Sequence, residues 1–237
     1  MSISLLSLAL VSATTQAKAS PEVKVWGALR PIIMEGKRDS KIILEKAGIT
    51  PDTFGVGAVA ELDGEITIVG GKIYLSRSRN RLCQLDSDQR AMKSGAAMVT
   101  ISHVKKWQEV AVPQSLSWGE IDSWIDKKAD ELGLDTESRI PFQFVGKFSE
   151  VTAHIIDGKN IPAGPSSHEV HAKSGVQFNS KNEEGTVVGF FSKHDAGVIT
   201  HHTTYTHMHI VIPQKEFAGH VDGLVVTAET KLLLPRY

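Results

Sequence analysis

Three histidines near the carboxyl end, His207, His209 and His220, constrain the possible folds of this chain more than any other feature. In an extended strand, residues two apart lie on the same side, so His207 and His209 present their imidazoles together, roughly 7 Å apart along the strand. Between His209 and His220 the sequence passes through an apolar run, Pro213, a polar stretch and Gly219. This pattern predicts a strand, a turn and a returning strand, which would bring the third ring beside the first two.

Such a cluster is typical of a catalytic zinc site, since structural zinc sites usually have four protein ligands and here a fourth position stays open. The metal hypothesis therefore names His207, His209 and His220 as ligands and Zn²⁺ as the cofactor. Six of the ten histidines lie between His194 and His220, so accidental clustering or surface placement is the competing explanation. The adjacent His201 and His202 point to opposite faces of any strand, so at most one can join the cluster, and solvated loop positions are expected for both.

Composition excludes several classes of protein. A chain of 237 residues with 41% hydrophobic and 22% charged residues is ordinary for a globular protein and argues against disordered and fibrous classes. The net charge of −1, with both signs interspersed, indicates neither nucleic acid nor a membrane surface as a partner. The single cysteine, Cys83, excludes an intramolecular disulfide.

Residues 1–19 have the pattern of a secretory signal peptide. A short apolar run over residues 5–11 is followed by polar residues and then by Ala17-Lys18-Ala19, an A-x-A cleavage pattern. The run is too short to span a bilayer, so no stable membrane insertion is expected. No lysine or arginine precedes the run, and a buried first strand or a misplaced start codon are the alternatives. The sequence predicts a cleaved signal peptide and a periplasmic or secreted protein.

The part of the chain before residue 138 has signals for both helices and strands. Asp39-Ser40 predict the start of a short helix that Gly48 ends, with the apolar residues Ile42, Ile43, Leu44 and Ala47 along it. Residues 54–74 predict a strand, a turn at Asp63-Gly64, a second strand and a turn at Gly70-Gly71. Residues 96–104 predict a further strand. Residues 117–120 form a capping box that opens a helix ending at residue 133.

After residue 140 the sequence changes to short runs typical of β-strands, at residues 142–148, 151–156, 187–191, 207–212 and 224–226. The fold class we expect is mixed α/β, with two sheet-containing subdomains, a few helices and a β-rich C-terminal half. The subdomains are predicted over residues 20–138, of mixed α/β type, and 139–237, which is β-rich and has the three histidines.

Several blocks resemble the acetolactate decarboxylase family, and they occur in that family's order. They are L-D-G-E-I-T-I-V-G-G-K-I-Y (Leu62–Tyr74), G-T-V-V-G-F (Gly185–Phe190) and the pattern H-M-H followed by G-H-V around the three histidines. The blocks Trp26–Gly36 and Ala97–Ile101 resemble it more loosely. Together the blocks cover most of residues 23–226 and are more specific than any one alone.

This resemblance implies a homodimeric, two-domain α/β enzyme with zinc on the three histidines and a glutamate at Glu65 that takes part in proton transfer. It implies conversion of 2-acetolactate into acetoin and carbon dioxide. A 2-hydroxy-3-oxo acid offers a hydroxyl and a ketone oxygen to zinc. Glu65 would deliver the proton if its pKa lies near the working pH. Without the resemblance, Glu65 reads as a solvated residue beside a tight turn.

Two departures from the family pattern concern the substrate. The family has an arginine in the block aligned with Phe148–Ile156, and here that place holds His154, which is shorter, titratable and unable to form a bidentate pair with a carboxylate. The family also uses a glutamate in a C-terminal extension, and this sequence stops at Tyr237, before that position. We interpret the metal platform as retained and the substrate contacts as altered. His154 reads equally well as a substrate contact and as a strand residue with a satisfied hydrogen bond.

The leading functional hypothesis is a zinc-dependent decarboxylase, a lyase that acts on a small-molecule 2-hydroxy-3-oxo acid. The alternatives are a zinc-dependent hydrolase of an ester or lactone, with Glu65 as base, and an exported metal-binding homologue without catalysis. A cupin also presents H-x-H on a strand. It is disfavoured because the acid expected three or four residues after His209 is missing, and the next glutamate is Glu216.

Overall fold

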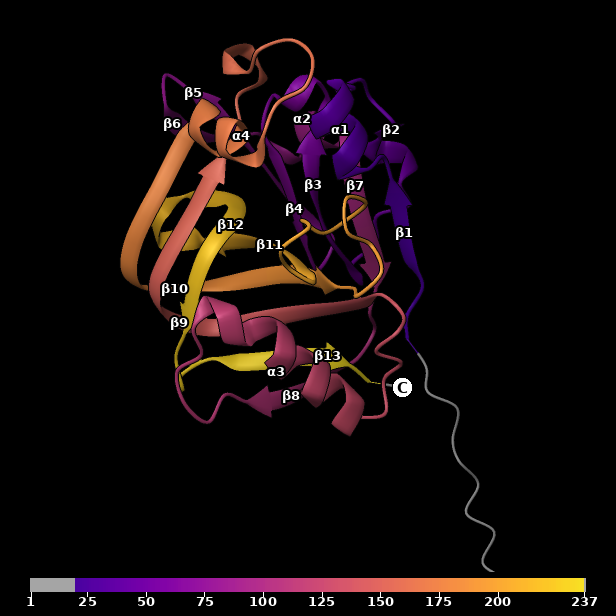
Figure 1. The fold of residues 1–237 in the computed structure, drawn as a ribbon, viewed down its shortest axis with the longest axis vertical. Helices are drawn as coiled ribbons and strands as arrows, with labels where there is room; N and C mark the ends of the chain where they lie inside the picture. The colour runs from indigo at the N-terminus through magenta and orange to yellow at the C-terminus, as the bar shows by residue number, and fades with distance from the viewer. Residues whose placement is uncertain (1–19, 237) are drawn as a thin grey trace, which may run out of the picture.

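Two β-sheets make up most of the computed structural model, which describes residues 20–236 (Figure 1). The strands of the first are β1 (Val23–Trp26), β2 (Ile42–Ile43), β3 (Thr53–Val59), β4 (Glu65–Val69), β5 (Lys72–Arg79), β6 (Leu82–Leu85) and β7 (Gly95–His103). Their order is β1-β7-β3-β4-β5-β6, with β2 beside β7. The predicted signal peptide, residues 1–19, lies outside the described residues. No helix within residues 20–236 is long and apolar enough to cross a membrane.

The second sheet follows in the chain. Its strands are β8 (Trp107–Ala111), β9 (Ile140–Ile155), β10 (Val176–Phe191), β11 (Thr206–Ile212), β12 (Phe217–Val226) and β13 (Lys231–Pro235). Their order is β10-β11-β12-β9-β13-β8, and β10 also pairs with β9, so that β9, β10, β11 and β12 form a closed ring of strands. The helices are α1 (Leu29–Glu35), α2 (Asp88–Met92), α3 (Trp118–Glu131) and α4 (His168–Ser174). The expected mixed, β-rich fold class is confirmed.

Three apolar clusters hold these layers together. One lies within the second sheet and under α3, and includes Phe142 and Ile125. Another joins the two sheets, because Met98 of β7 and Phe190 of β10 belong to it. The last covers the outer face of the first sheet and includes Ile66 of β4. Apolar side chains are therefore buried on both faces of the first sheet and in the contact between the two sheets.

At a bulge in strand β12, the core-facing residues change from odd-numbered to even-numbered positions. The register with β9 shifts between Val221 and Gly223, which makes Asp222 an extra residue on β12. Phe217 and Val221 before the bulge pack into the same apolar cluster as Leu224 and Val226 after it. Strict alternation would put these two pairs on opposite faces. The bulge therefore keeps both halves of the strand in the core.

One predicted helix is absent from the structure. The helix predicted over residues 39–47 is wrong, because Ile42 and Ile43 pair with β7 and only Leu44–Lys46 form a 3-10 turn. β-branched residues favour a strand, and Leu44 is completely buried as the chain turns away. The domain boundary predicted near residue 138 stays a prediction, and β8 and α3, which precede that residue, belong with the second sheet and its core.

The predicted capping box at the start of α3 is present and offers a stability test. The Glu120 carboxylate accepts hydrogen bonds from the backbone N–H and the hydroxyl of Ser117 at 2.9 and 2.5 Å. We expect Ser117→Ala to lower the free energy of unfolding by about 0.5–2 kcal/mol, measured by urea unfolding. Ser123→Ala, in the exposed middle of the same helix, is the matched control and should be neutral or slightly stabilising. Equal effects of the two changes would contradict a capping role for Ser117.

Candidate metal centre

Three neighbouring strands of the second sheet bring histidines together on one face. His209 of β11 lies opposite His220 of β12, and His220 lies opposite His154 of β9. His207 is two residues before His209 and shares its face, while Met208 between them packs into the core on the other side. The predicted strand, turn and returning strand are therefore present, and a row of imidazoles crosses the sheet.

The rings of His207, His209 and His220 are close enough for one cation. One ligand atom from each lies within 4.8 Å of the others, and Nε2 of His207 lies 3.2 Å from Nδ1 of His220. The ring centroids are 4.9 to 5.4 Å apart. In a tetrahedral zinc site with Zn–N bonds of about 2.0–2.1 Å, two ligand nitrogens lie about 3.4 Å apart. The spacing of the donor atoms therefore suits a zinc-sized ion.

The nitrogen that His209 presents to this cluster has no other partner. Its Nδ1 lies 3.1 Å from the hydroxyl of Thr67, which comes from β4 of the first sheet. Nε2 of His209 is buried without a hydrogen-bond partner. A ring held at one nitrogen by a polar side chain, with the other nitrogen unpartnered, is the usual arrangement of a metal-binding histidine. The donor set, three imidazoles in which Nε2 of His209 and Nδ1 of His207 are buried without a hydrogen-bond partner, therefore fits a divalent cation.

Glu65, the first residue of β4, points into the space between the sheets and is only 3% exposed. Its Oε2 lies 3.8 Å from Nε2 of His209, its Oε1 lies 3.9 Å from Nε2 of His154, and the N–H of Ile156 donates to Oε1 at 3.3 Å. The simpler expectation of a solvated residue beside a turn is therefore wrong.

The glycine before Glu65 is required by the turn. Gly64 has φ +130°, and a Cβ on it would lie 2.1 Å from the carbonyl oxygen of Ser76. Only glycine fits such a close approach without displacing β5. The residue that precedes Glu65 thus fixes the point at which β4 starts and where its first side chain points.

Burial sets the charge state of these groups. It raises the pKa of Glu65 well above its ordinary value, opposed by the Ile156 N–H and assisted by the negative charge of Asp222. Burial also lowers the pKa of His207 to about 4 and lowers the pKa values of His209 and His220 well below the ordinary value. Neutral imidazoles are the form that binds metal, and a protonated carboxyl is the form that donates a proton.

His154 is held in place by a carboxylate. Its Nδ1 lies 2.7 Å from Oδ2 of Asp222, and its side chain is almost completely buried. This contact directs Nε2 toward Glu65. His154 is therefore a strand residue with a satisfied hydrogen bond that also lies beside the candidate catalytic carboxyl, and its role as a substrate contact stays a prediction.

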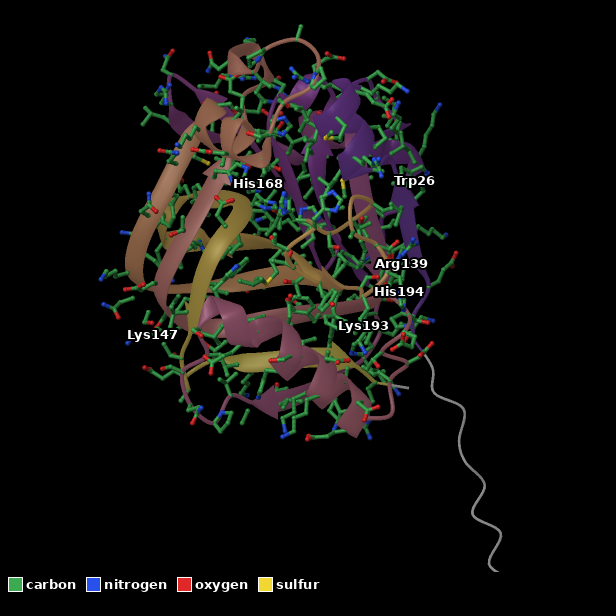
Figure 2. All side chains as sticks on the ribbon, viewed as in Figure 1. Trp26, Arg139, Lys147, His168, Lys193 and His194 are labelled. Carbon is green, nitrogen blue, oxygen red and sulfur yellow. The ribbon has the colours of Figure 1, made fainter. Side chains whose placement is uncertain are left out.

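Three residues of the site were not found from the sequence: Thr67, His168 and Asp222. His168 begins α4, and its Nε2 lies 3.6 Å from Oδ1 of Asp222. Figure 2 labels His168 just below α4, in the upper half of the molecule. The sequence contained a signal for Asp222, because it stands two positions after His220 in H-V-D. It contained no signal for His168, which lies far from the three histidines in the sequence.

Neither of the adjacent histidines in the loop before β11 joins the three-histidine cluster. The ring of His201 lies 5.0 Å from that of His168, and His201 is half-buried rather than solvated. His202 is exposed, as expected. The rest of the loop adds threonine side chains to the edge of the site.

Two cavities meet at the site and share Leu29, His168, His207 and His220. The larger, of about 230 Å³, has threonine hydroxyls and Asp222 on its walls. The smaller, of about 50 Å³, contains Glu65 and His154 among mainly apolar neighbours. Within residues 20–236, neither cavity has a lysine or arginine in its lining. Imidazoles and carboxyl groups therefore supply the ionisable groups next to any bound molecule.

A family model described as alpha-acetolactate decarboxylase matches residues 28–233 of the chain. The alpha-acetolactate decarboxylase of Brevibacillus brevis is 24% identical over 192 residues. That match covers 81% of this chain and 62% of the relative, so the chain spans less than two thirds of that protein's length.

Solved structures show the same fold. The alpha-acetolactate decarboxylase of Bacillus subtilis strain 168 superposes with a TM-score of 0.70 at 16% identity, over 91% of this chain and 86% of that one. A Staphylococcus aureus protein of unknown function, described as similar to alpha-acetolactate decarboxylase, gives a TM-score of 0.68 at 16% identity, over 90% and 84% of the two chains. Both likenesses extend over both sheets.

Proposed function

Because the chain belongs to the alpha-acetolactate decarboxylase family, we propose that it is a zinc-dependent decarboxylase of a 2-hydroxy-3-oxo acid. The substrate we expect is 2-acetolactate, and the products are acetoin and carbon dioxide. One observation supports this most strongly. The buried Glu65 has its two oxygens 3.8 and 3.9 Å from ring nitrogens of His209 and His154, directly beside the three-histidine cluster.

The cation would be held by His207, His209 and His220, whose donor atoms are close together and whose rings are neutral. When bound, zinc supplies Lewis acidity toward the hydroxyl and ketone oxygens of such a substrate. Thr67 keeps the ring of His209 oriented from the opposite sheet. The protein's part is therefore to hold three neutral donors rigidly and to leave the cavity side open.

The proton chemistry is assigned to Glu65. When the C–C bond to the carboxylate breaks, carbon dioxide leaves and the electron pair remains on the carbon, which must take up one proton. Glu65 holds a proton because burial raises its pKa, and it delivers that proton to the carbon. His154 and the Ile156 N–H fix the direction of the carboxyl, and the apolar walls of the smaller cavity limit access of water. A proton from solvent then restores Glu65.

A second candidate, hydrolysis of a lactone or ester, is favoured by one feature. The described lining of both cavities has no lysine or arginine, which suits an uncharged substrate. In that reaction Glu65 would have to accept a proton from water, and the raised pKa of Glu65 opposes such a role. We therefore rank hydrolysis second. A cation-binding protein without turnover is the third possibility.

We expect the zinc-loaded protein to form acetoin from racemic 2-acetolactate faster than the uncatalysed reaction. The measurement is colorimetric or chromatographic acetoin as a function of time, with the metal-free protein as the control and a lactone panel in parallel. Acetoin at the uncatalysed rate, from protein shown to contain zinc, would exclude this substrate. Lactone hydrolysis in the same preparation would then support the second candidate, and inactivity on both would support the third.

Two further expectations from the sequence stay predictions. They are export through the signal peptide at residues 1–19, which gives a periplasmic or secreted protein, and assembly into a homodimer. The first rests on the composition of the leader and the second on the family resemblance.

A further inference from the structure

His220 has potential metal ligands near both of its ring nitrogens. Nδ1 lies 3.2 Å from Nε2 of His207, and Nε2 lies 4.0 Å from Oδ1 of Asp222. His168 approaches the same carboxylate oxygen, with its Nε2 at 3.6 Å. One ligand atom from each of His168, His220 and Asp222 lies within 4.8 Å of the others. We propose that these three residues form a second divalent-cation position beside the three-histidine cluster.

The two carboxylate oxygens of Asp222 have different surroundings. Oδ2 accepts the hydrogen bond of His154 at 2.7 Å, whereas Oδ1 is buried and has no hydrogen-bond partner. A buried carboxylate oxygen without a partner is costly, and a cation satisfies it. The same aspartate thus orients His154 with one oxygen and offers the other to a metal.

The surroundings of Oδ1 favour a cation. Asp222 is the one acidic side chain among the described residues that line the larger cavity, and no lysine or arginine lines that cavity to neutralise it. Two imidazoles and one carboxylate are a donor set that suits zinc or cobalt, with the remaining positions open to water. The cavity of about 230 Å³ provides the room for those waters.

The backbone explains how the three donors meet. Asp222 is the extra residue of the β12 bulge, and bulges commonly redirect a side chain. His168 is the first residue of α4, and its side chain is 37% exposed on the cavity side. The second position is therefore reached directly from the larger cavity, whereas the three-histidine cluster lies deeper.

The shared histidine predicts unequal affinities. An imidazole that binds a cation at each nitrogen has lost its ring proton, so His220 releases one proton to solvent as the second ion binds. Repulsion between two dications a few ångströms apart also weakens the second step. We expect a tight first site on the three histidines and a weaker second site on His168, His220 and Asp222.

The test is a metal count on the full chain, with Zn²⁺ as the probe. Chelator-stripped protein is titrated calorimetrically with Zn²⁺, and the bound metal is counted after equilibrium dialysis. The wild type should bind about two ions per chain in two steps, and His168→Gln should keep the tight step and bind about one. Asp222→Asn, which keeps the volume and an acceptor for His154, should also bind about one.

His194→Gln is the matched control, because His194 is an exposed histidine that contacts Glu137 at 2.8 Å and could bind zinc at the surface. This variant should bind as many ions as the wild type. A single zinc ion per chain in the wild type would overturn the proposal. So would a second ion that persists in both His168→Gln and Asp222→Asn, or one that is lost in His194→Gln. The count does not depend on turnover, so failure of the acetoin assay and failure of this proposal are separate results.

Discussion

Replacing Glu65 with glutamine is expected to lower kcat for acetoin formation by about 10²- to 10⁴-fold, the usual contribution of a positioned proton donor. Glutamine keeps the volume of the side chain and can still accept the hydrogen bond from the Ile156 N–H, but its amide cannot deliver a proton to carbon. Zinc content should stay at the wild-type level, because the donor atoms of the three histidines are unchanged. The measurement is steady-state acetoin formation together with metal analysis of the same sample.

Glu61→Gln is the matched control for this change. Glu61 is exposed and lies four residues earlier, so Glu61→Gln makes the same side-chain exchange outside the site. Its kcat should equal that of the wild type. If Glu65→Gln retained wild-type turnover with zinc bound, the proton would have to come from another group and the mechanism proposed for Glu65 would be wrong.

The second large effect concerns the three-histidine cluster. His209→Gln removes a metal ligand. Loss of a residue that only hydrogen-bonds to a ligand lowers metal affinity by up to about 100-fold, so we expect loss of the ligand itself to lower zinc affinity by more than that. Thr67→Val removes only such a partner, the hydroxyl 3.1 Å from Nδ1 of His209, so its affinity should fall by about 10- to 100-fold. Acetoin formation at limiting zinc should decline in the same order.

Competition with a chromogenic chelator measures both affinities on the same scale. His103→Gln is a suitable control, because His103 lies at the end of β7 and contacts Thr53 rather than the site. Its zinc affinity should equal that of the wild type. Wild-type affinity in His209→Gln would show that the cluster is not where zinc binds.

The part of the site that could be predicted depends on local sequence. Two histidines in H-x-H share a strand face, and the turn between His209 and His220 is marked by Pro213 and Gly219, so their meeting follows from spacing alone. The capping box of α3 is equally local, and the helix starts at the predicted place.

The remainder depends on how the two sheets pack, which periodicity does not encode. Glu65 and Thr67 come from β4, and their contacts with His154 and His209 exist only because the first sheet lies over the second. Glu65 was identified as a candidate catalytic residue through the family resemblance, because the pattern of polar and apolar residues around it does not indicate such a role. His168 could not be found, because nothing in its neighbourhood shows that the start of α4 lies against β12.

The errors in the fold come from short apolar runs. Residues 42–47 suit either a helix turn or a strand, and pairing with β7 decides the outcome. Residues 142–148 and 151–156 were expected as separate runs but form the single strand β9, since pairing with β10 continues across the polar residues between them. Long-range pairing overrides local composition in both cases.

The bulge in β12 makes position 222 tolerant of one kind of change and intolerant of another. A substitution there alters only what is offered to His154 and to the cavity, whereas removing the residue would restore regular alternation and turn Leu224 and Val226 away from the apolar layer. Exchanging the side chain at position 222 is therefore expected to change the chemistry of the cavity, whereas deleting the residue is expected to destabilise the whole domain.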